Sequence, residues 1–117
     1  MVPRMKTLIQ AKNMKPTRAL RRFIDEQVNK VQRLGVPIAR LRVFLENITR
    51  KDSDPHRASV QMEANIPGKG KVTVKSQAHD LYLAVNEAVR SLMRHVRKEK
   101  EKRISISRRK RHRGKLW

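Results

Sequence analysis

The segment DLYLAVNEAVRSLMRHVRKEKEKR, residues 80–103, has the strongest periodic pattern in the chain. Its apolar residues recur at spacings of three and four, which places them on one face of a helix. These residues are Leu81, Val85, Ala88, Val89, Leu92 and Val96. Arg90, Arg94, Lys98 and Lys102 recur every four residues on a second face. Such a helix can pack on a small domain through its apolar side while it presents cations to solvent. We expect the upstream chain to form the surface on which it docks.

The upstream residues predict four strands and one further helix. Apolar and polar residues alternate with a period of two, the pattern of half-buried strands. The predicted strands cover residues 5–12, 38–47, 57–66 and 71–77. Between the first two, apolar residues at helical spacing predict an amphipathic helix over Arg18–Leu34. Thr17 is its expected N-cap, and Gly35 suits its C-terminal end.

The element order β-α-β-β-β-α predicts the architecture. Three successive strands with short connections indicate an antiparallel meander, and Pro67–Gly70 reads as a hairpin turn because it lacks the spacing of a phosphate-binding P-loop. Each strand is apolar on one face, so two helices must cover that face and leave the other wet. We therefore expect an α+β two-layer sandwich, a four-stranded mixed sheet with both helices on one face. Residues 1–104 form this domain, and residues 105–117 form a basic tail that is disordered until it meets an anion.

The charge narrows the class of partner. The chain has 117 residues, with 30 Lys and Arg against 10 Asp and Glu, and a formal net charge of +20. Such an imbalance repels itself in a compact state, which favours a polyanionic partner. Nucleic acid is the first candidate, an anionic membrane surface the second, and a solubility device the third. No apolar run approaches the roughly 20 residues that span a bilayer, and the start lacks a secretory signal, so we expect a cytoplasmic protein.

Nothing in the sequence indicates an enzyme. The absence of cysteine excludes disulfides, thiolate catalysis and cysteine-ligated metal sites. The four histidines, His56, His79, His95 and His112, are scattered, and no pair has metal-ligand spacing. The serines have no nucleophile-elbow context. We expect no catalytic residues, no metal, no cofactor and no small-molecule substrate.

The cations of the C-terminal third are the candidate site. From Arg90 to the end there are 13 Lys and Arg against two acidic residues, whereas ordinary solvated faces mix both signs. Lys30 and Arg33 of the first helix either bind a polyanion or complement the helix dipole. The candidate RNA-binding residues are Arg22, Lys30, Arg33, Arg90, Arg94, Arg97, Lys98, Lys102, Arg108, Arg109 and Arg111.

Base stacking is a weaker expectation. Phe44 and Tyr82 are candidate stacking groups, although a tyrosine at a helix start is more often a packing residue. The middle strands lack the aromatic signature of an RRM. The helices and tail are therefore expected to read the charge and shape of a structured RNA.

The second helix resembles that of the ribosome hibernation-promoting and ribosome-associated translation inhibitor (factor Y) family. The shared opening is Asp80, Leu81, Tyr82, Ala84 and Val85, followed by a basic helix. The resemblance extends upstream through the start of the first helix and the three strands, over residues 5–103. It implies a β-α-β-β-β-α fold similar to that of double-stranded RNA-binding domains. The chain resembles the short form of the family, which lacks a C-terminal dimerisation domain.

The resemblance also implies a function. Family members bind the small ribosomal subunit in the channel for messenger and transfer RNA, where basic side chains of both helices meet ribosomal RNA and inhibit translation in stationary or stressed cells. Arg94, Lys98 and Lys102 match basic family positions on the second helix, and Lys30 and Arg33 match those on the first. Ser91 departs from the pattern, since family members often carry lysine there. The alternatives are a general nucleic-acid-binding architectural protein and a constitutive ribosomal component.

Overall fold

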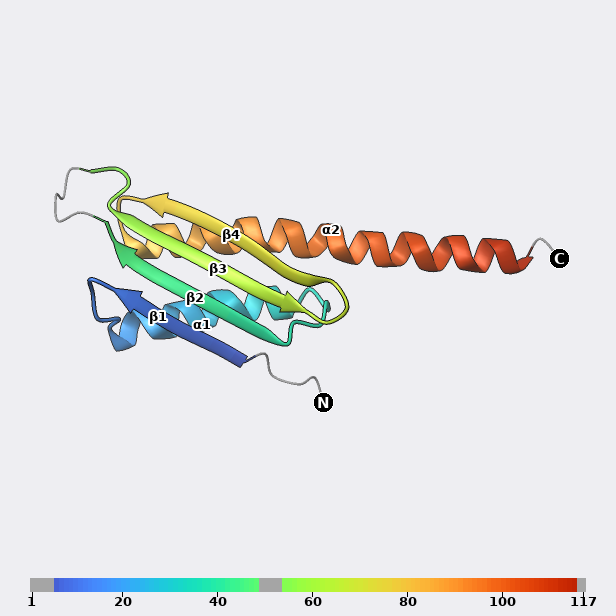
Figure 1. Ribbon diagram of the computed structural model, residues 1–117, viewed down its shortest axis with the longest axis horizontal. Helices are drawn as coiled ribbons and strands as arrows, with labels where there is room; N and C mark the ends of the chain where they lie inside the picture. The colour runs from blue at the N-terminus through green and yellow to red at the C-terminus, as the bar shows by residue number, and fades with distance from the viewer. Residues whose placement is uncertain (1–5, 49–53, 116–117) are drawn as a thin grey trace.

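The computed structural model describes residues 6–48 and 54–115, with side chains as far as Glu101. These residues form β1 (Lys6–Lys12), α1 (Arg18–Gln32), β2 (Arg40–Asn47), β3 (Ala58–Ile66), β4 (Gly70–Ala78) and α2 (Leu81–Lys115). The sheet has the order β1-β2-β3-β4, and both helices lie behind it in Figure 1. β1 and β2 are parallel, whereas the other two pairings are antiparallel. The predicted α+β sandwich with a mixed sheet is confirmed.

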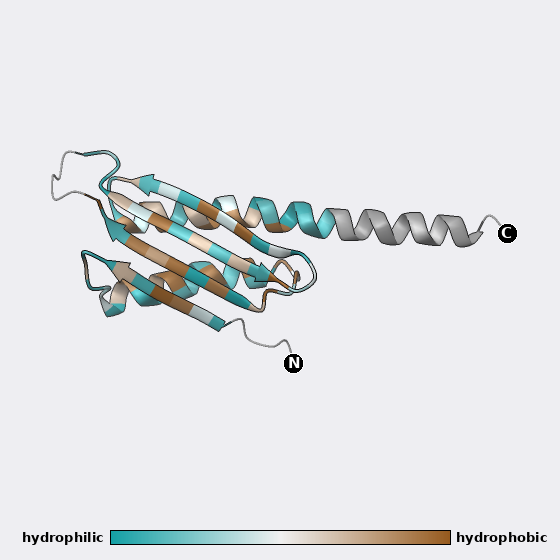
Figure 2. Cartoon of the chain, viewed as in Figure 1, coloured by the Kyte–Doolittle hydropathy of each residue, from teal (hydrophilic) through white to brown (hydrophobic). Residues whose placement is uncertain are grey.

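The alternation along the strands sorts their side chains between the two faces of the sheet. Leu41, Val43 and Leu45 of β2 are buried, whereas Arg40 and Arg42, which alternate with them, are exposed. In β3 the residues at every second position from Ala58 to Ile66 are buried, while of the residues between them Asn65 is exposed, Gln61 and Glu63 are partly buried and Ser59 is buried. Figure 2 shows the resulting alternation of hydrophobic and hydrophilic residues along the strands. The helices thus cover one face, and the other face is open to solvent.

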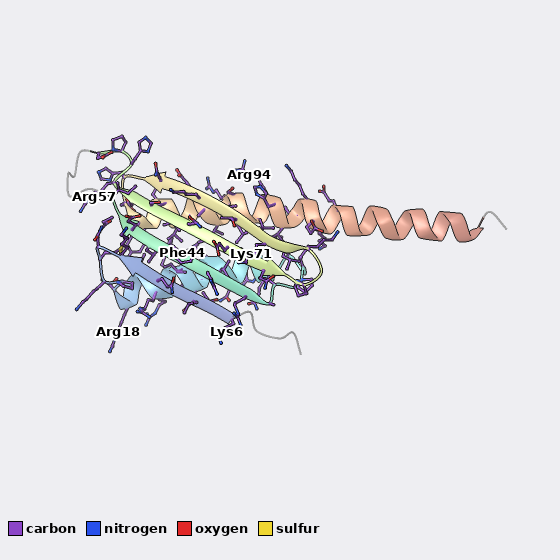
Figure 3. The ribbon with its side chains drawn as sticks, in the orientation of Figure 1. Lys6, Arg18, Phe44, Arg57, Lys71 and Arg94 are labelled. Atoms are coloured by element: carbon purple, nitrogen blue, oxygen red, sulfur yellow. The ribbon has the colours of Figure 1, made fainter. Side chains whose placement is uncertain are left out.

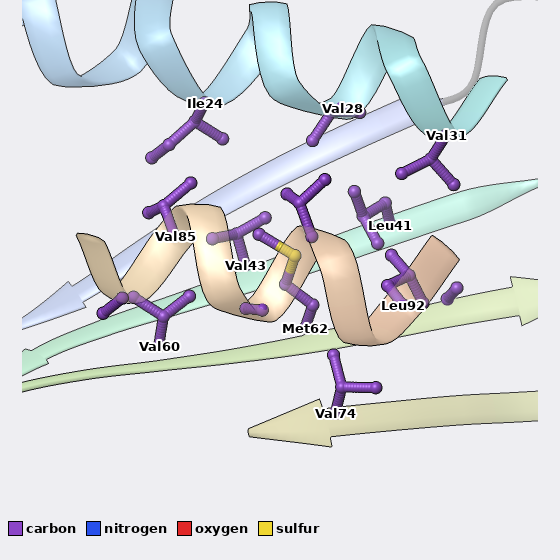
Figure 4. Close-up of a cluster of buried hydrophobic side chains, with 14 of the residues drawn as sticks. Ile24, Val28, Val31, Leu41, Val43, Val60, Met62, Val74, Val85 and Leu92 are labelled. Carbon is purple, nitrogen blue, oxygen red and sulfur yellow. The ribbon is translucent and has the colours of Figure 1, made fainter. Parts of the chain in front are cut away.

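The core lies between that apolar face and the two helices. Ile24, Val28 and Val31 of α1 and Val85 and Leu92 of α2 meet strand residues there (Figure 4). The core is almost entirely aliphatic, as the low aromatic content predicts. The expected Thr17 cap is present, and Asp80 caps the start of α2 in a similar way. The Thr17 hydroxyl accepts a hydrogen bond from the Leu20 amide at 3.1 Å, and the Asp80 carboxylate accepts one from the Leu83 amide at 2.9 Å.

The Pro67–Gly70 segment is a hairpin turn, as expected. The Lys69 amide donates to the Ile66 carbonyl at 3.0 Å, with Pro67 and Gly68 between them. Gly68 has φ +82°, which is the requirement at the third position of a type II turn. Proline at the second position and glycine at the third are the preferred residues there. The sequence of this turn is therefore explained by backbone geometry alone.

The C-terminal helix is longer than predicted. The sequence pattern ends at Arg103, and a disordered tail was expected from residue 105, but the backbone is helical as far as Lys115. Helix elongation adds one hydrogen bond per residue once a nucleus exists, and the docked half of α2 supplies that nucleus. The first strong helix breaker after Asp80 is Gly114. A helix of 35 residues is about 52 Å long, so α2 extends past the sheet (Figure 1).

Contacts at both ends of the docked part hold α2 in place. Near its start, the Tyr82 ring lies edge to face with Phe23 of α1, with the centroids 5.0 Å apart. Tyr82 thus has the packing role that its position at a helix start suggested, although it is 44% exposed. Further along, Glu99 Oε1 pairs with Lys69 Nζ of the β3–β4 turn at 3.3 Å. These contacts join α2 to α1 and to the hairpin.

We predict that Leu92→Ala lowers the free energy of unfolding by about 2–5 kcal/mol, because Leu92 is fully buried and its loss leaves a cavity. Leu83→Ala is the matched control on the same helix. Leu83 is 45% exposed, so this change should alter stability by about 0.5 kcal/mol or less. Urea unfolding followed by far-ultraviolet circular dichroism measures both. Equal losses would contradict the described docking of α2.

Candidate nucleic-acid interface

Three arginines form the outward crest of α2. Arg90, Arg94 and Arg97 have the spacing i, i+4, i+7, which gathers them within an arc of about 60° on a helix. They lie opposite the stripe that contains Val85, Leu92 and other core residues, and all three are exposed. The packing of α2 on the sheet therefore fixes which way these cations face.

A groove on the α1 side of the crest brings the two helices together. Gln27 and Lys30 of α1 line it, with Val89 and Met93 of α2 as its apolar part. Lys30 Nζ donates to Gln27 Oε1 at 3.0 Å, so a neighbouring side chain restrains this ammonium. Lys30 is itself exposed. It stands across the groove from the arginine crest and adds a cation from a second element.

The other side of the crest borders the edge strand β4. Lys75 and Ser76 of β4 line the same open cavity, which has a volume of about 840 Å³. Ser76 Oγ and Glu87 Oε2 of α2 are 2.8 Å apart, so the hydroxyl donates to the carboxylate. This bond joins α2 to β4 beside the arginines. Figure 3 labels Arg94 on α2 at this side of the molecule.

The cavity has a strong excess of positive charge. Five cations line it, and Glu87 is its one carboxylate among the described residues. The cations are Lys30, Lys75, Arg90, Arg94 and Arg97. An open, exposed surface with several cations suits a chain of phosphates better than a small molecule, because it has little enclosed volume and much exposed charge. We call these residues the helix-side basic groove.

The structure does not place every predicted site residue in this groove. Arg22 and Arg33 are exposed on α1, but neither lines the groove, and Arg33 is the C-cap residue. Lys98 is exposed about 40° further round α2 than Arg94, on the side of β4. The side chains of Lys102, Arg108, Arg109 and Arg111 lie outside the described residues, as does Trp117.

The four-residue spacing in the sequence and the lining of the groove therefore identify different sets of cations. Residues spaced by four, here Arg90, Arg94, Lys98 and Lys102, move about 40° around the helix at each step. Arg97, seven residues after Arg90, instead lies within the arc of the crest. Ser91, the departure from the family pattern, lines the groove together with the crest residues. Sequence reasoning did not find Lys75. The alternating pattern of β4 places Lys75 on one face of the strand. This would have identified Lys75 as a candidate only if the pairing of β4 with β3 and the position of β4 at the sheet edge had been known.

Other chemistry has little support in the described part of the chain. No group of three or more His, Cys, Asp or Glu residues there is arranged to hold a metal ion. Among the same residues, no helix is both long enough and apolar enough to span a membrane.

Comparison with known proteins identifies the family. The model of the sigma 54 modulation protein / S30EA ribosomal protein family matches residues 7–104. The chain belongs to this family. The match covers all of the sheet except Lys6, together with α1 and the docked part of α2, and it confirms the resemblance seen in the sequence. No curated protein matched the chain.

Solved structures share the fold of this family member. The N-terminal domain of Thermus thermophilus Protein Y is 23% identical, with a TM-score of 0.66 over 80% of this chain and 96% of that one. A ribosomal subunit interface protein from Coxiella burnetii is 15% identical, with a TM-score of 0.70 over 83% of this chain and 99% of that one. At these identities the likeness concerns the fold.

We predict that Glu87→Gln strengthens the retention of the protein on heparin, a general polyanion. The change removes the carboxylate of the groove, while an amide oxygen can still accept from Ser76. The gain should be at most about fivefold in affinity, because exposed charge pairs contribute up to about 1 kcal/mol. Glu26→Gln, on the exposed side of α1, is the matched control. Equal gains from both variants would mean that net charge alone governs retention.

Proposed function

We propose that this protein binds the small ribosomal subunit and inhibits translation by occupying the channel for messenger and transfer RNA in stationary or stressed cells. Family membership supports association with ribosomes. The observation that carries the finer proposal is the helix-side basic groove, where cations of two helices and one strand face outward together. Ribosomal RNA offers the matching array of phosphates. The site of action is then the cytoplasm.

The mechanism is occupancy without catalysis. Lys30, Arg90, Arg94 and Arg97 neutralise phosphates of ribosomal RNA, and the release of condensed counterions contributes much of the affinity. The rigid sandwich behind them then fills space that messenger or transfer RNA would need. This requires no cofactor and no small-molecule substrate. The Coxiella burnetii protein of the same fold is a ribosomal subunit interface protein, which agrees with such a location.

The remaining predicted contacts extend the groove. Lys98 adds charge on the β4 side of the crest, and Arg22 and Arg33 add charge on the outer surface of α1. Lys102, Arg108, Arg109 and Arg111 continue along the helix that projects past the sheet. In this proposal, these last four residues contact RNA that lies beyond the sheet and its docked helices.

A general nucleic-acid-binding architectural protein is the second candidate, because the net charge of +20 is not confined to one surface. Extracts of growing and starved cells, fractionated on sucrose gradients, separate the proposals. A hibernation factor should accompany ribosomal fractions mainly after starvation. An architectural protein should instead follow bulk nucleic acid, and a constitutive ribosomal component should keep a fixed stoichiometry during growth. Displacement of the protein from small subunits by messenger and transfer RNA would test the occupied channel.

We predict that Arg94→Ala combined with Arg97→Ala weakens binding to purified small subunits by roughly 30-fold, if each contact contributes about 1 kcal/mol. The slope of log affinity against log salt should also become shallower by up to about 1.8, since each phosphate contact contributes about 0.9. Fluorescence anisotropy of labelled protein, titrated with subunits at several salt concentrations, measures both quantities.

The matched control removes two arginines from a different surface. Arg18 and Arg21 of α1 are exposed and do not line the groove. Arg18→Ala combined with Arg21→Ala lowers the net charge equally but should reduce affinity and salt slope much less than the groove variant, because neither side chain lines the groove. Equal effects from both double variants would refute a defined binding surface and favour the architectural alternative.

A further inference from the structure

The face of the sheet away from the helices has an organised surface of its own. Strand register places its side chains in rows across the four strands. The row through the middle of β2 is Gln10, Phe44, Gln61 and Lys75. Neighbouring strands lie about 4.8 Å apart, so side chains paired on one face are adjacent. The Phe44 ring therefore has a carboxamide on each side, and Figure 3 shows it over the middle of the sheet.

Phe44 has no counterpart to cover it in the described structure. Both helices pack on the opposite face, and Phe44 remains only partly buried. Gln10, Phe44 and Gln61 line a shallow depression of about 680 Å³, which Glu46 and Lys12 also border. A partly exposed aromatic ring between two amide groups is a suitable platform for a nucleobase. The ring stacks on the base, and the amides can hydrogen-bond its edge.

The surroundings of this platform are cationic. Within the four described strands, the open face carries six Lys and Arg side chains against two carboxylates. The cations are Lys6, Lys12, Arg40, Arg42, Lys71 and Lys75. Each carboxylate already has a partner, because Glu63 accepts from Gln61 Nε2 at 3.2 Å and Glu46 lies 3.9 Å from Lys12 Nζ. The charge of this face is therefore complementary to a phosphate backbone.

Lys75 connects this face with the helix-side basic groove. Its register places it in the row of Phe44, and it also lines the cavity beside Arg94. β4 is an edge strand, so no further strand separates the two surfaces there. One RNA could continue from the groove, around this edge, onto the sheet.

We propose that the open sheet face is a second RNA-binding surface, which takes single-stranded RNA with one base stacked on Phe44. A duplex suits this face poorly, because its bases are stacked on one another and present no free ring surface. The surface is separate from the groove proposed for ribosomal RNA, and its test does not depend on ribosome binding.

Binding of a fluorescein-labelled 12-nucleotide oligouridylate, followed by anisotropy, tests this proposal. Phe44→Leu should weaken binding roughly fivefold or more, the effect of losing one stacked base, and Phe44→Tyr should retain it. Phe23→Leu makes the same chemical change on the helix side, where the ring contacts Tyr82, and should leave oligouridylate binding unchanged. Urea unfolding of each variant verifies that it is folded at the assay temperature.

Four further measurements separate the proposal from its alternatives. Arg42→Ala should make the salt slope for oligouridylate shallower by about 0.7, the contribution of one single-strand phosphate contact. Arg94→Ala with Arg97→Ala should weaken binding to small subunits. In a separate assay, Phe44→Leu should not weaken binding to a 12-base-pair RNA duplex. Ultraviolet crosslinking of 4-thiouridine oligonucleotide should recover peptides of β2.

Oligouridylate binding that is unaffected by Phe44→Leu would overturn the proposal, as would the absence of single-strand binding. Sedimentation that reveals a dimer dispersed by Phe44→Leu would also overturn it, because the face would then be occupied by a second copy of this chain. Failure of the small-subunit experiment alone would refute the proposed ribosomal function and leave this inference standing.

Discussion

The one-sided sheet is the constraint on which the rest of this structure depends. Leu41 and Val43 of β2, and Val60 and Met62 of β3, all face the same way, and leaving them in water would be costly. In the described part of the chain, the two amphipathic helices α1 and α2 cover them. A slip of one residue in strand pairing would turn this whole set toward solvent, so register and helix docking specify one another. The direction of every charged side chain on α2 follows from that docking.

Much of the fold could be predicted because its signals are local and repeated. Each signal is contained within a few neighbouring residues: the alternation of β2 and β3, the Thr17 cap and the apolar stripe of α2. The end of α2 could not be predicted in this way. Beyond Arg103 the sequence has no apolar stripe at helical spacing, and favourable elongation, which explains the continued helix, leaves no periodic trace in the sequence.

The candidate site was predicted less completely, and the reason is spatial. Lys30, Arg90, Arg94 and Arg97 were all among the predicted cations of the two helices, but the four-residue spacing selected Lys98 and Lys102 in place of Arg97. Whether Lys30 stands beside α2 depends on how the helices pack, which sequence spacing does not encode. Lys75 joins the groove only because β4 is an edge strand next to α2.

Phe44 is a related case. The RRM signature requires several aromatic residues at fixed positions, and the strands lack it. The role proposed for Phe44 depends instead on its neighbours in the folded sheet, Gln10 of β1 and Gln61 of β3. The two basic surfaces also have different chemistry. The helix side presents cations at helical spacing, which suits the phosphate backbone of a structured RNA. The sheet side presents an aromatic ring and two amides between cations, which suits a single base. Two such surfaces on one small domain would let a single RNA be held at two points, and the second contact then forms at high effective concentration.

The packing of Tyr82 against Phe23 makes the domain optically simple to follow. The chain has one tyrosine, and that ring lies at the contact between α1 and α2. Once Trp117, the one tryptophan of the chain, is replaced by Phe to remove its overlapping band, the near-ultraviolet tyrosine band reports mainly on this contact between the two helices. Since Lys30 and the arginine crest lie on the same two helices, any ligand that draws them together or apart changes an intrinsic signal, and no label is required.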